Sequence, residues 1–215
     1  VAKSAFWVTK KRYGQWIIND GGLVCEKLDV KGLDIVRSNF PKAMREIMTN
    51  VLKDILFGEN KDVIDDKIIT FKNEMKKMPL DDIALPTGVK GMDKYTDKKS
   101  SKGNVFTTVY KGTPVHVKAS IKYNDLLKYF GLNNIEPIKN SSKIKWIYLK
   151  NNNLGIEASA FKGYDDPDEI MKFIEDHVDY DKLYKGAMEK KIKMFYEALK
   201  WELPVDKKNT LERFF

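Results

Sequence analysis

Three cations and a tyrosine, Lys10, Lys11, Arg12 and Tyr13, follow one another near the start of this 215-residue sequence, between aromatic and β-branched residues. Ammonium and guanidinium groups pair with phosphate through charge-assisted hydrogen bonds, and a tyrosine hydroxyl adds a neutral donor. The run therefore suits a strand that holds something anionic. The alternative is a solvated strand edge, where cations discourage pairing with another chain.

Strand geometry would give these side chains two directions. Because side chains alternate along a strand, Lys11 and Tyr13 are expected on one face and Lys10 and Arg12 on the other. In the minor groove of duplex DNA, every base pair presents acceptors at purine N3 and pyrimidine O2. An ammonium and a hydroxyl can donate to those atoms whatever the sequence, so the pair can sense base-pair geometry without reading bases.

A second candidate anion site is Arg37 with Ser38, just before a predicted helix that begins at Pro41. Unpaired N–H groups at a helix start attract phosphate, and an arginine with a hydroxyl would complete the site. The alternative is that Ser38 or Asn39 only caps the helix. Both interpretations can hold together.

A third group of candidates lies on a later predicted helix, and its members could grip a duplex backbone: His116, Lys118, Lys122, Tyr123 and Asn124. Lys118 and Lys122 stand four residues apart, on one helix face. The alternatives are a partly buried, hydrogen-bonded histidine and a merely solvated face at Lys122.

Hydrophobic periodicity predicts the elements that must position these residues. Residues 5–28 are predicted to form strands "AFWVTKKRY", "QWIIND" and "LVCEKL", interrupted by Gly14 and by a turn at Asp20-Gly21-Gly22. An amphipathic helix should start at Pro41 and end near Gly58. Its apolar positions are Met44, Ile47, Met48, Val51, Leu52, Ile55 and Leu56.

The rest of the chain alternates helices with one hairpin. The predicted elements are a helix at about 60–78, a mobile connection over 86–112 with a short strand at 105–110, a helix from Thr113-Pro114 to Gly131, a hairpin of "KIKWIYLK" and "LGIEASAF", a helix opened by Asp166-Pro167, and a helix at about 179–201 with Leu183, Met188, Ile192, Phe195 and Leu199 inward. The fold class is therefore α+β, a small β start followed by helices with an inserted β-hairpin.

Charge is localised along the chain. The net charge is +8, but residues 98–150 alone contain 11 lysines against two acids, a net +9, which suggests a polyanion footprint. The lone Cys25 excludes an internal disulfide, and the low His and Cys content argues against zinc. We assign the acids at 165–169 to a helix start rather than to a metal site, and expect the four tryptophans to serve packing rather than base stacking.

Three stretches occur in a fixed order: "AFWVTKKRYGQWIIND", "GLDIVRSNFPKAMREIMTNVLKDIL" and "PVHVKASIKYN". This order resembles the end of the palm and the thumb of family B DNA polymerases of the T-even bacteriophage type. The resemblance implies a palm end at 1–30, a thumb at 31–208 and a sliding-clamp-binding tail at 209–215. It also implies minor-groove contacts for Lys11 and Tyr13, with Lys10 and Arg12 nearer phosphates or neighbouring protein.

The catalytic motifs of that family, including an Asp-Thr-Asp-Ser type turn, do not occur in these 215 residues. The resemblance thus implies a chain inactive alone, with no catalytic residue and no cofactor of its own. Mg²⁺ and dNTP would belong to the complete polymerase, whose N-terminal part (exonuclease, palm and fingers) would be a partner beside primer–template DNA. The expected location is the cytoplasm of an infected bacterial host, with no membrane. A stand-alone basic DNA-binding module and a protein-interaction scaffold are the alternatives.

The final "NTLERFF" spaces Leu211, Phe214 and Phe215 as L-x-x-F-F, which one helical turn would place on a single face. Apolar residues tethered by a polar run can order in a partner's hydrophobic pocket. The resemblance implies that this partner is a sliding clamp. A frayed terminus, or a staple folded back on the chain, is the alternative.

Overall fold

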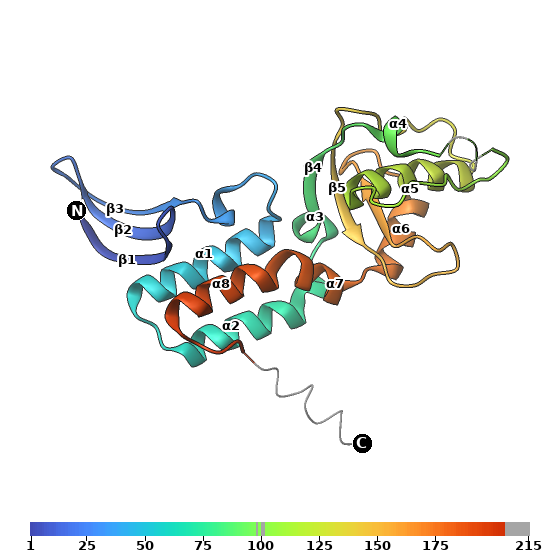
Figure 1. Ribbon diagram of the computed structural model, residues 1–215. Helices are drawn as coiled ribbons and strands as arrows, with labels where there is room; N and C mark the ends of the chain where they lie inside the picture. Colours follow the sequence, from blue (N-terminus) through green and yellow to red (C-terminus); the bar gives the residue numbers. More distant parts are fainter. Residues whose placement is uncertain (98, 100–101, 205–215) are drawn as a thin grey trace, which may run out of the picture. The chain divides into compact units, whose positions relative to one another are not determined.

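The computed structural model describes residues 1–97, 99 and 102–204 (Figure 1). The chain forms two compact units, the first made of residues 1–78 together with the chain from Tyr184 onward, and the second of Pro79–Leu183. Each unit combines helices with a three-stranded sheet, so the predicted α+β class is confirmed. The palm and thumb boundaries are a different kind of division and stay a prediction.

The first unit begins with an antiparallel sheet in the order β1-β2-β3, formed by Ala2–Thr9, Arg12–Asp20 and Leu23–Lys31. The predicted break at Gly14 is wrong, because this glycine lies inside β2. A Cβ atom at Gly14 would lie 2.7 Å from a methyl of Leu52. The missing side chain therefore lets the helix α1 (Lys42–Phe57) approach the sheet closely.

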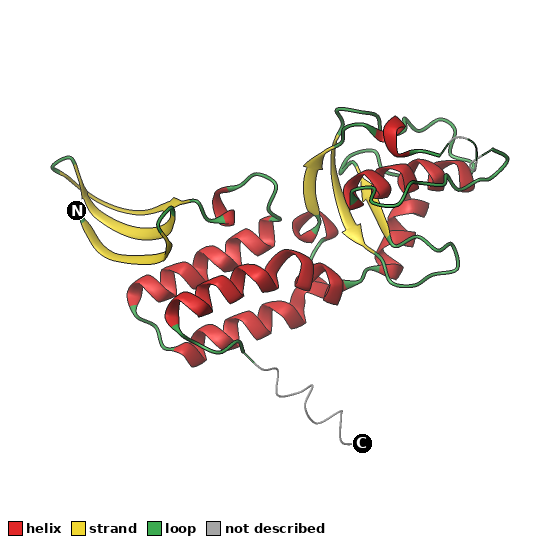
Figure 2. Cartoon of the chain, in the orientation of Figure 1, coloured by secondary structure: helices red, strands yellow, loops and turns green. Residues whose placement is uncertain are grey.

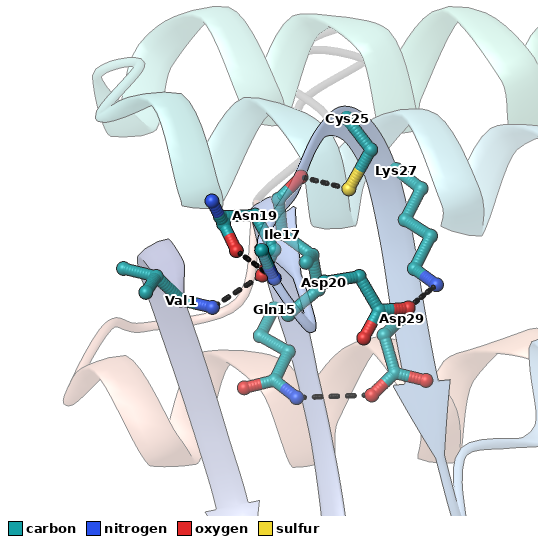
Figure 3. A network of polar contacts seen from close by, with 9 residues as sticks. Val1, Gln15, Ile17, Asn19, Asp20, Cys25, Lys27 and Asp29 are labelled. Atoms are coloured by element: carbon teal, nitrogen blue, oxygen red, sulfur yellow. Dashed lines mark hydrogen bonds and ion pairs between the residues drawn. The ribbon is translucent and has the colours of Figure 1, made fainter.

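The β2–β3 hairpin has the predicted glycine turn, with positive φ at both Gly21 and Gly22. Figure 3 shows the polar contacts that hold it: Gln15 Nε2 donates to Asp29 Oδ2 at 2.9 Å, and the Lys27 ammonium pairs with Asp20 at 2.5 Å. These contacts cross the hairpin and support the register that the turn chemistry favours.

Helices α1 (Lys42–Phe57), α2 (Lys61–Glu74) and α8 (Lys190–Leu199) complete the first unit (Figure 2). The prediction for α1 is confirmed at both ends: it follows Pro41 and stops at Gly58, whose φ is 78°. Aromatic and polar contacts join the layers. Phe6 of β1 meets Phe195 edge-on with ring centroids 5.3 Å apart, and Tyr196 donates its hydroxyl to Asp65 at 2.5 Å.

The predicted single helix over 179–201 is in fact three segments: α7 (Tyr180–Tyr184), a π-helical turn η3 (Lys185–Glu189) and α8. Four of the predicted inward residues, Leu183, Met188, Ile192 and Phe195, are buried, and the π-turn accounts for the five-residue spacing between Leu183 and Met188. Leu199 was predicted to face inward but is only half-buried, whereas Tyr196, which was not predicted to do so, is buried. The helix stops at Lys200, in the left-handed conformation, before Pro204.

The second unit has a sheet in the order β4-β5-β6, formed by Leu85–Gly88, Lys143–Tyr148 and Ala158–Phe161. The predicted hairpin corresponds to β5 and β6, which pair antiparallel. Helix α5 (Val115–Tyr129) packs against both of these strands and also against α6 (Asp168–His177). Both helices begin directly after a proline, as predicted.

The region 86–112 is more ordered than predicted where it is described. It contains β4 and the short α4 (Met92–Tyr95), whereas the expected strand at 105–110 is reduced to one bridge between Thr96 and Val109. The sequence pattern does not predict β4, because a proline such as Pro86 disfavours a strand. A proline is nevertheless tolerated on an edge strand such as this one. The other short elements are η1 (Asp34–Val36), η2 (Met75–Lys77) and α3 (Leu80–Ile83).

No helix within the described ranges is long and apolar enough to span a membrane.

Candidate nucleic-acid interface

The cationic run lies at the tip of a hairpin and not along one strand. Lys10 and Lys11 form the turn between β1 and β2, and Thr9 pairs with Arg12 across it. The prediction that Lys11 and Tyr13 share a strand face is therefore wrong, because Lys11 lies in the turn and only Arg12 and Tyr13 belong to β2. Folding back at this point concentrates charge: the side chains of both turn lysines are exposed, and neither has a polar partner among the described residues.

Gly32 supports this turn from the end of β3, a role that the sequence pattern missed. Its φ is +69°, and a Cβ placed on it would lie 2.1 Å from the carbonyl oxygen of Lys11 and 3.1 Å from Cγ of Arg12. The backbone of the turn therefore rests directly on Gly32. The predicted strand ended at Leu28, so the sequence held no signal beyond the presence of a glycine shortly after it.

We expect Gly32→Ala to disrupt the turn and Gly58→Ala to serve as its matched control. Both glycines have positive φ, but nothing lies within 4 Å of a Cβ at Gly58. The control should cost about 1 kcal/mol of unfolding free energy from backbone strain alone. Gly32→Ala adds overlap with a backbone oxygen that no rotamer relieves, so its cost should reach about 3 kcal/mol. Denaturant unfolding of both variants measures the difference, and equal losses would contradict the contact.

Arg37 and Ser38 are both exposed, as an anion site requires. Asp34 bridges two cations: Arg37 Nη1 lies 3.1 Å from Oδ1, and the ammonium of Lys191 lies 2.9 Å from Oδ2. The alternative that Ser38 or Asn39 caps α1 is wrong, because Pro41 is the N-cap and the helix has no side-chain cap.

Arg45 on α1 holds the segment before the helix, and the sequence did not suggest this role. Its Nη2 donates to the carbonyl oxygens of Arg37 at 3.1 Å and Phe40 at 2.9 Å. Arg12 Nη1 reaches Met194 Sδ of α8 at 3.4 Å, three residues from Lys191. Contacts through α8 thus link the base of the hairpin tip to the Asp34 ion pairs.

The candidates on α5 are divided by the side of the helix they occupy. Lys122 is only 9% exposed, and its ammonium donates to the Thr107 carbonyl at 2.7 Å and to Asp125 at 3.1 Å. The alternative of a merely solvated face at Lys122 is therefore wrong, and the ammonium proposed to grip a duplex is bound internally. Asp125 is itself buried and accepts from the backbone and side chain of Thr107, so this network anchors the loop before α5.

Tyr123 and Asn124 are also engaged internally. The buried Tyr123 donates its hydroxyl to Asp166 Oδ1 at 2.8 Å, and burial together with this bond raises the pKa of Tyr123 far above its ordinary value. Asn124 exchanges two hydrogen bonds of 2.8 Å with the backbone of Ile138. Asp166 does more than begin a helix, since it also accepts from the backbone N–H of Lys162 and Gly163.

His116 and Lys118 remain accessible on α5. Burial lowers the pKa of His116, so its imidazole is neutral at physiological pH and can offer a hydrogen bond rather than a charge. Lys118 pairs with the exposed Glu157 at 2.6 Å, and this contact lowers the pKa of that carboxyl. A phosphate could replace the carboxylate at little cost, because exposed ion pairs are weak.

Metal and tail candidates complete the set. Within the described part of the chain, no three His, Cys, Asp or Glu side chains cluster as a metal site would require. Asp168 and Glu169 occupy the first turn of α6, as predicted. Leu211, Phe214 and Phe215 lie outside the described residues.

Comparison with known protein families gives a match to the family model described as DNA polymerase family B, over residues 1–185. The matched range includes the hairpin tip, the Arg37 segment and the whole of α5. No curated protein matches the chain.

Proposed function

Because the chain belongs to DNA polymerase family B, whose members are nucleotidyltransferases acting on DNA, we propose that it supplies the end of the palm and the thumb of such an enzyme and grips primer–template duplex. The observation that carries the proposal is the exposed turn of Lys10 and Lys11, which has no polar partner in the described chain and adjoins Tyr13. Uncompensated cations at a hairpin tip suit a polyanion. Palm covers 1–30 and thumb 31–208 in this proposal.

At the hairpin tip we assign minor-groove contacts to Lys11 and Tyr13. A flexible ammonium and a phenolic hydroxyl can both donate to purine N3 or pyrimidine O2 in any base pair. Lys10 and Arg12 would lie nearer the phosphates. This arrangement would hold a duplex irrespective of its sequence, as a replicating enzyme needs.

Backbone contacts are assigned to Arg37 and Ser38 in the first unit and to His116 and Lys118 in the second. Lys122, Tyr123 and Asn124 support the proposal indirectly, because their internal bonds fix α5 and the loop that precedes it. We therefore propose that these three residues position the DNA-binding helix and do not touch DNA themselves.

The chemistry would come from the N-terminal part of the polymerase, with its exonuclease, palm and fingers. Catalytic aspartates there would hold Mg²⁺ and the dNTP, since nucleotidyl transfer needs metal ions to stabilise the attacking and leaving oxygens. We further propose that the enzyme is of the T-even phage type, working in the cytoplasm of an infected bacterium. Its tail, through Leu211, Phe214 and Phe215, would bind a sliding clamp and raise the effective concentration of the enzyme at DNA.

The test is duplex binding by single-lysine variants over a salt series from about 50 to about 200 mM. Lys10→Ala and Lys118→Ala should weaken binding to every sequence and reduce the slope of log K against log salt by about one, the loss of one phosphate contact. Lys77→Ala is the control, because the side chain of Lys77 is exposed and is not among the proposed DNA contacts.

Two further variants sharpen the assignment. Glu157→Gln should strengthen binding, because it frees Lys118 from its carboxylate partner. Lys122→Ala should instead lower stability, because it leaves Asp125 buried without its cation. Fluorescence anisotropy with a labelled primer–template gives the affinities. Affinity that is indifferent to salt, or that falls equally with Lys77→Ala, would refute the proposal.

A further inference from the structure

Trp7 lies on the surface of the sheet, outside the core. Trp7 is 56% exposed, whereas its neighbour Phe6 is buried against Phe195. The alternation of β1 thus sends Phe6 toward the helices and Trp7 to the opposite face of the sheet.

The indole lies against Tyr13, its partner across the strands. Trp7 and Tyr13 are register partners in the β1–β2 pair, and their ring centroids are 4.5 Å apart with planes inclined by 37°. Such cross-strand aromatic pairs add stability beyond the area that they bury. Contact with the indole therefore restricts the rotamers open to the tyrosine ring.

The hydroxyl of Tyr13 is left free by this arrangement. Unlike Tyr123 and Tyr196, which donate to Asp166 and Asp65, Tyr13 has no hydrogen-bond partner within the described chain. The strand register shifts between Trp7 and Thr9, directly beside the pair. Irregularities of this kind redirect side chains next to functional sites.

We propose that Trp7 is a positioning residue: its indole braces the ring of Tyr13 and directs the free hydroxyl toward the minor groove at the primer end. This inference rests on the proposed role of Tyr13. Without Trp7, the ring of Tyr13 would populate several rotamers. Binding of its hydroxyl to an acceptor would then cost the entropy of fixing one of them. With Trp7 in place, the donor is oriented before DNA arrives.

The experiment measures primer extension by the complete polymerase from a matched and from a mismatched primer end. Tyr13→Phe removes the hydroxyl, and Trp7→Ala removes the brace. We expect each to reduce extension from the matched end about tenfold, the cost of losing about one neutral hydrogen bond. Discrimination against the mismatch should fall in parallel. Trp7→Phe keeps a flat ring and should restore most of the activity, whereas Trp7→Leu keeps bulk without a ring face and should not.

Coupling between the two residues separates positioning from a general structural role. In the Tyr13→Phe background, Trp7→Ala should have no further effect on extension or on discrimination. An equal effect of Trp7→Ala in both backgrounds would overturn the inference, as would full activity of Trp7→Leu. If Tyr13→Phe itself extends normally, the proposed role of Tyr13 fails and the inference falls with it. If Tyr13→Phe is impaired and Trp7→Ala is not, only the role of Trp7 is refuted.

Discussion

The 215-residue chain by itself should incorporate no nucleotide on a primed template with Mg²⁺. In-line nucleotidyl transfer requires metal ions held by carboxylates. The sequence contains no Asp-Thr-Asp-Ser type motif, and the part that the structure describes has no cluster of metal-ligating side chains. Primer extension with a labelled primer, followed over hours at excess protein, should therefore remain at background.

Addition of the N-terminal part of the polymerase should restore synthesis, and this is the positive control. The same mixture made with Lys11→Ala should be slower at the primer end although its catalytic carboxylates are intact. Synthesis that copurifies with the 215-residue chain through successive columns would contradict the prediction. A chain that neither binds the N-terminal part nor stimulates it, yet binds duplex, would favour the stand-alone DNA-binding module.

Deletion of residues 210–215 should abolish binding to the cognate sliding clamp and leave duplex affinity unchanged. Leu211, Phe214 and Phe215 are the apolar residues of this segment, and none of the proposed DNA contacts lies within it. Anchors of this kind carry most of the energy of a small peptide interface. Clamp binding measured by calorimetry, alongside duplex binding measured by anisotropy, separates the two functions.

Two substituted tails provide the matched comparison. Replacement of Leu211 and Phe214 by alanine should reproduce the deletion, because it removes two of the proposed anchors. Glu212→Gln combined with Arg213→Gln alters the charged residues between them and should bind the clamp nearly as well as the native tail. Equal clamp affinity with and without residues 210–215 would refute the assignment of the tail.

Local chemistry was enough to predict several of the regular elements. The helix α1 follows from apolar residues at helical spacing between Pro41 and Gly58, and both ends match the structure. The Gly21-Gly22 turn likewise needs positive φ at both residues, which glycine adopts without strain. These features depend on neighbours along the chain, so the sequence contains the information that determines them.

Sequence by itself thus determined the α+β class, the order of most elements and the residue types available for holding DNA. Only the tertiary structure decided which of those residues face outward. Lys118 and Lys122 lie on one helix by the same periodicity, but Lys122 turns inward because Asp125 and Thr107 satisfy its ammonium there. The contact of Gly32 with the Lys11 turn joins the end of β3 to the β1–β2 turn, and Trp7 contacts Tyr13 across two paired strands. Such pairings depend on register and on the approach of distant segments, and no local pattern in the sequence specifies them.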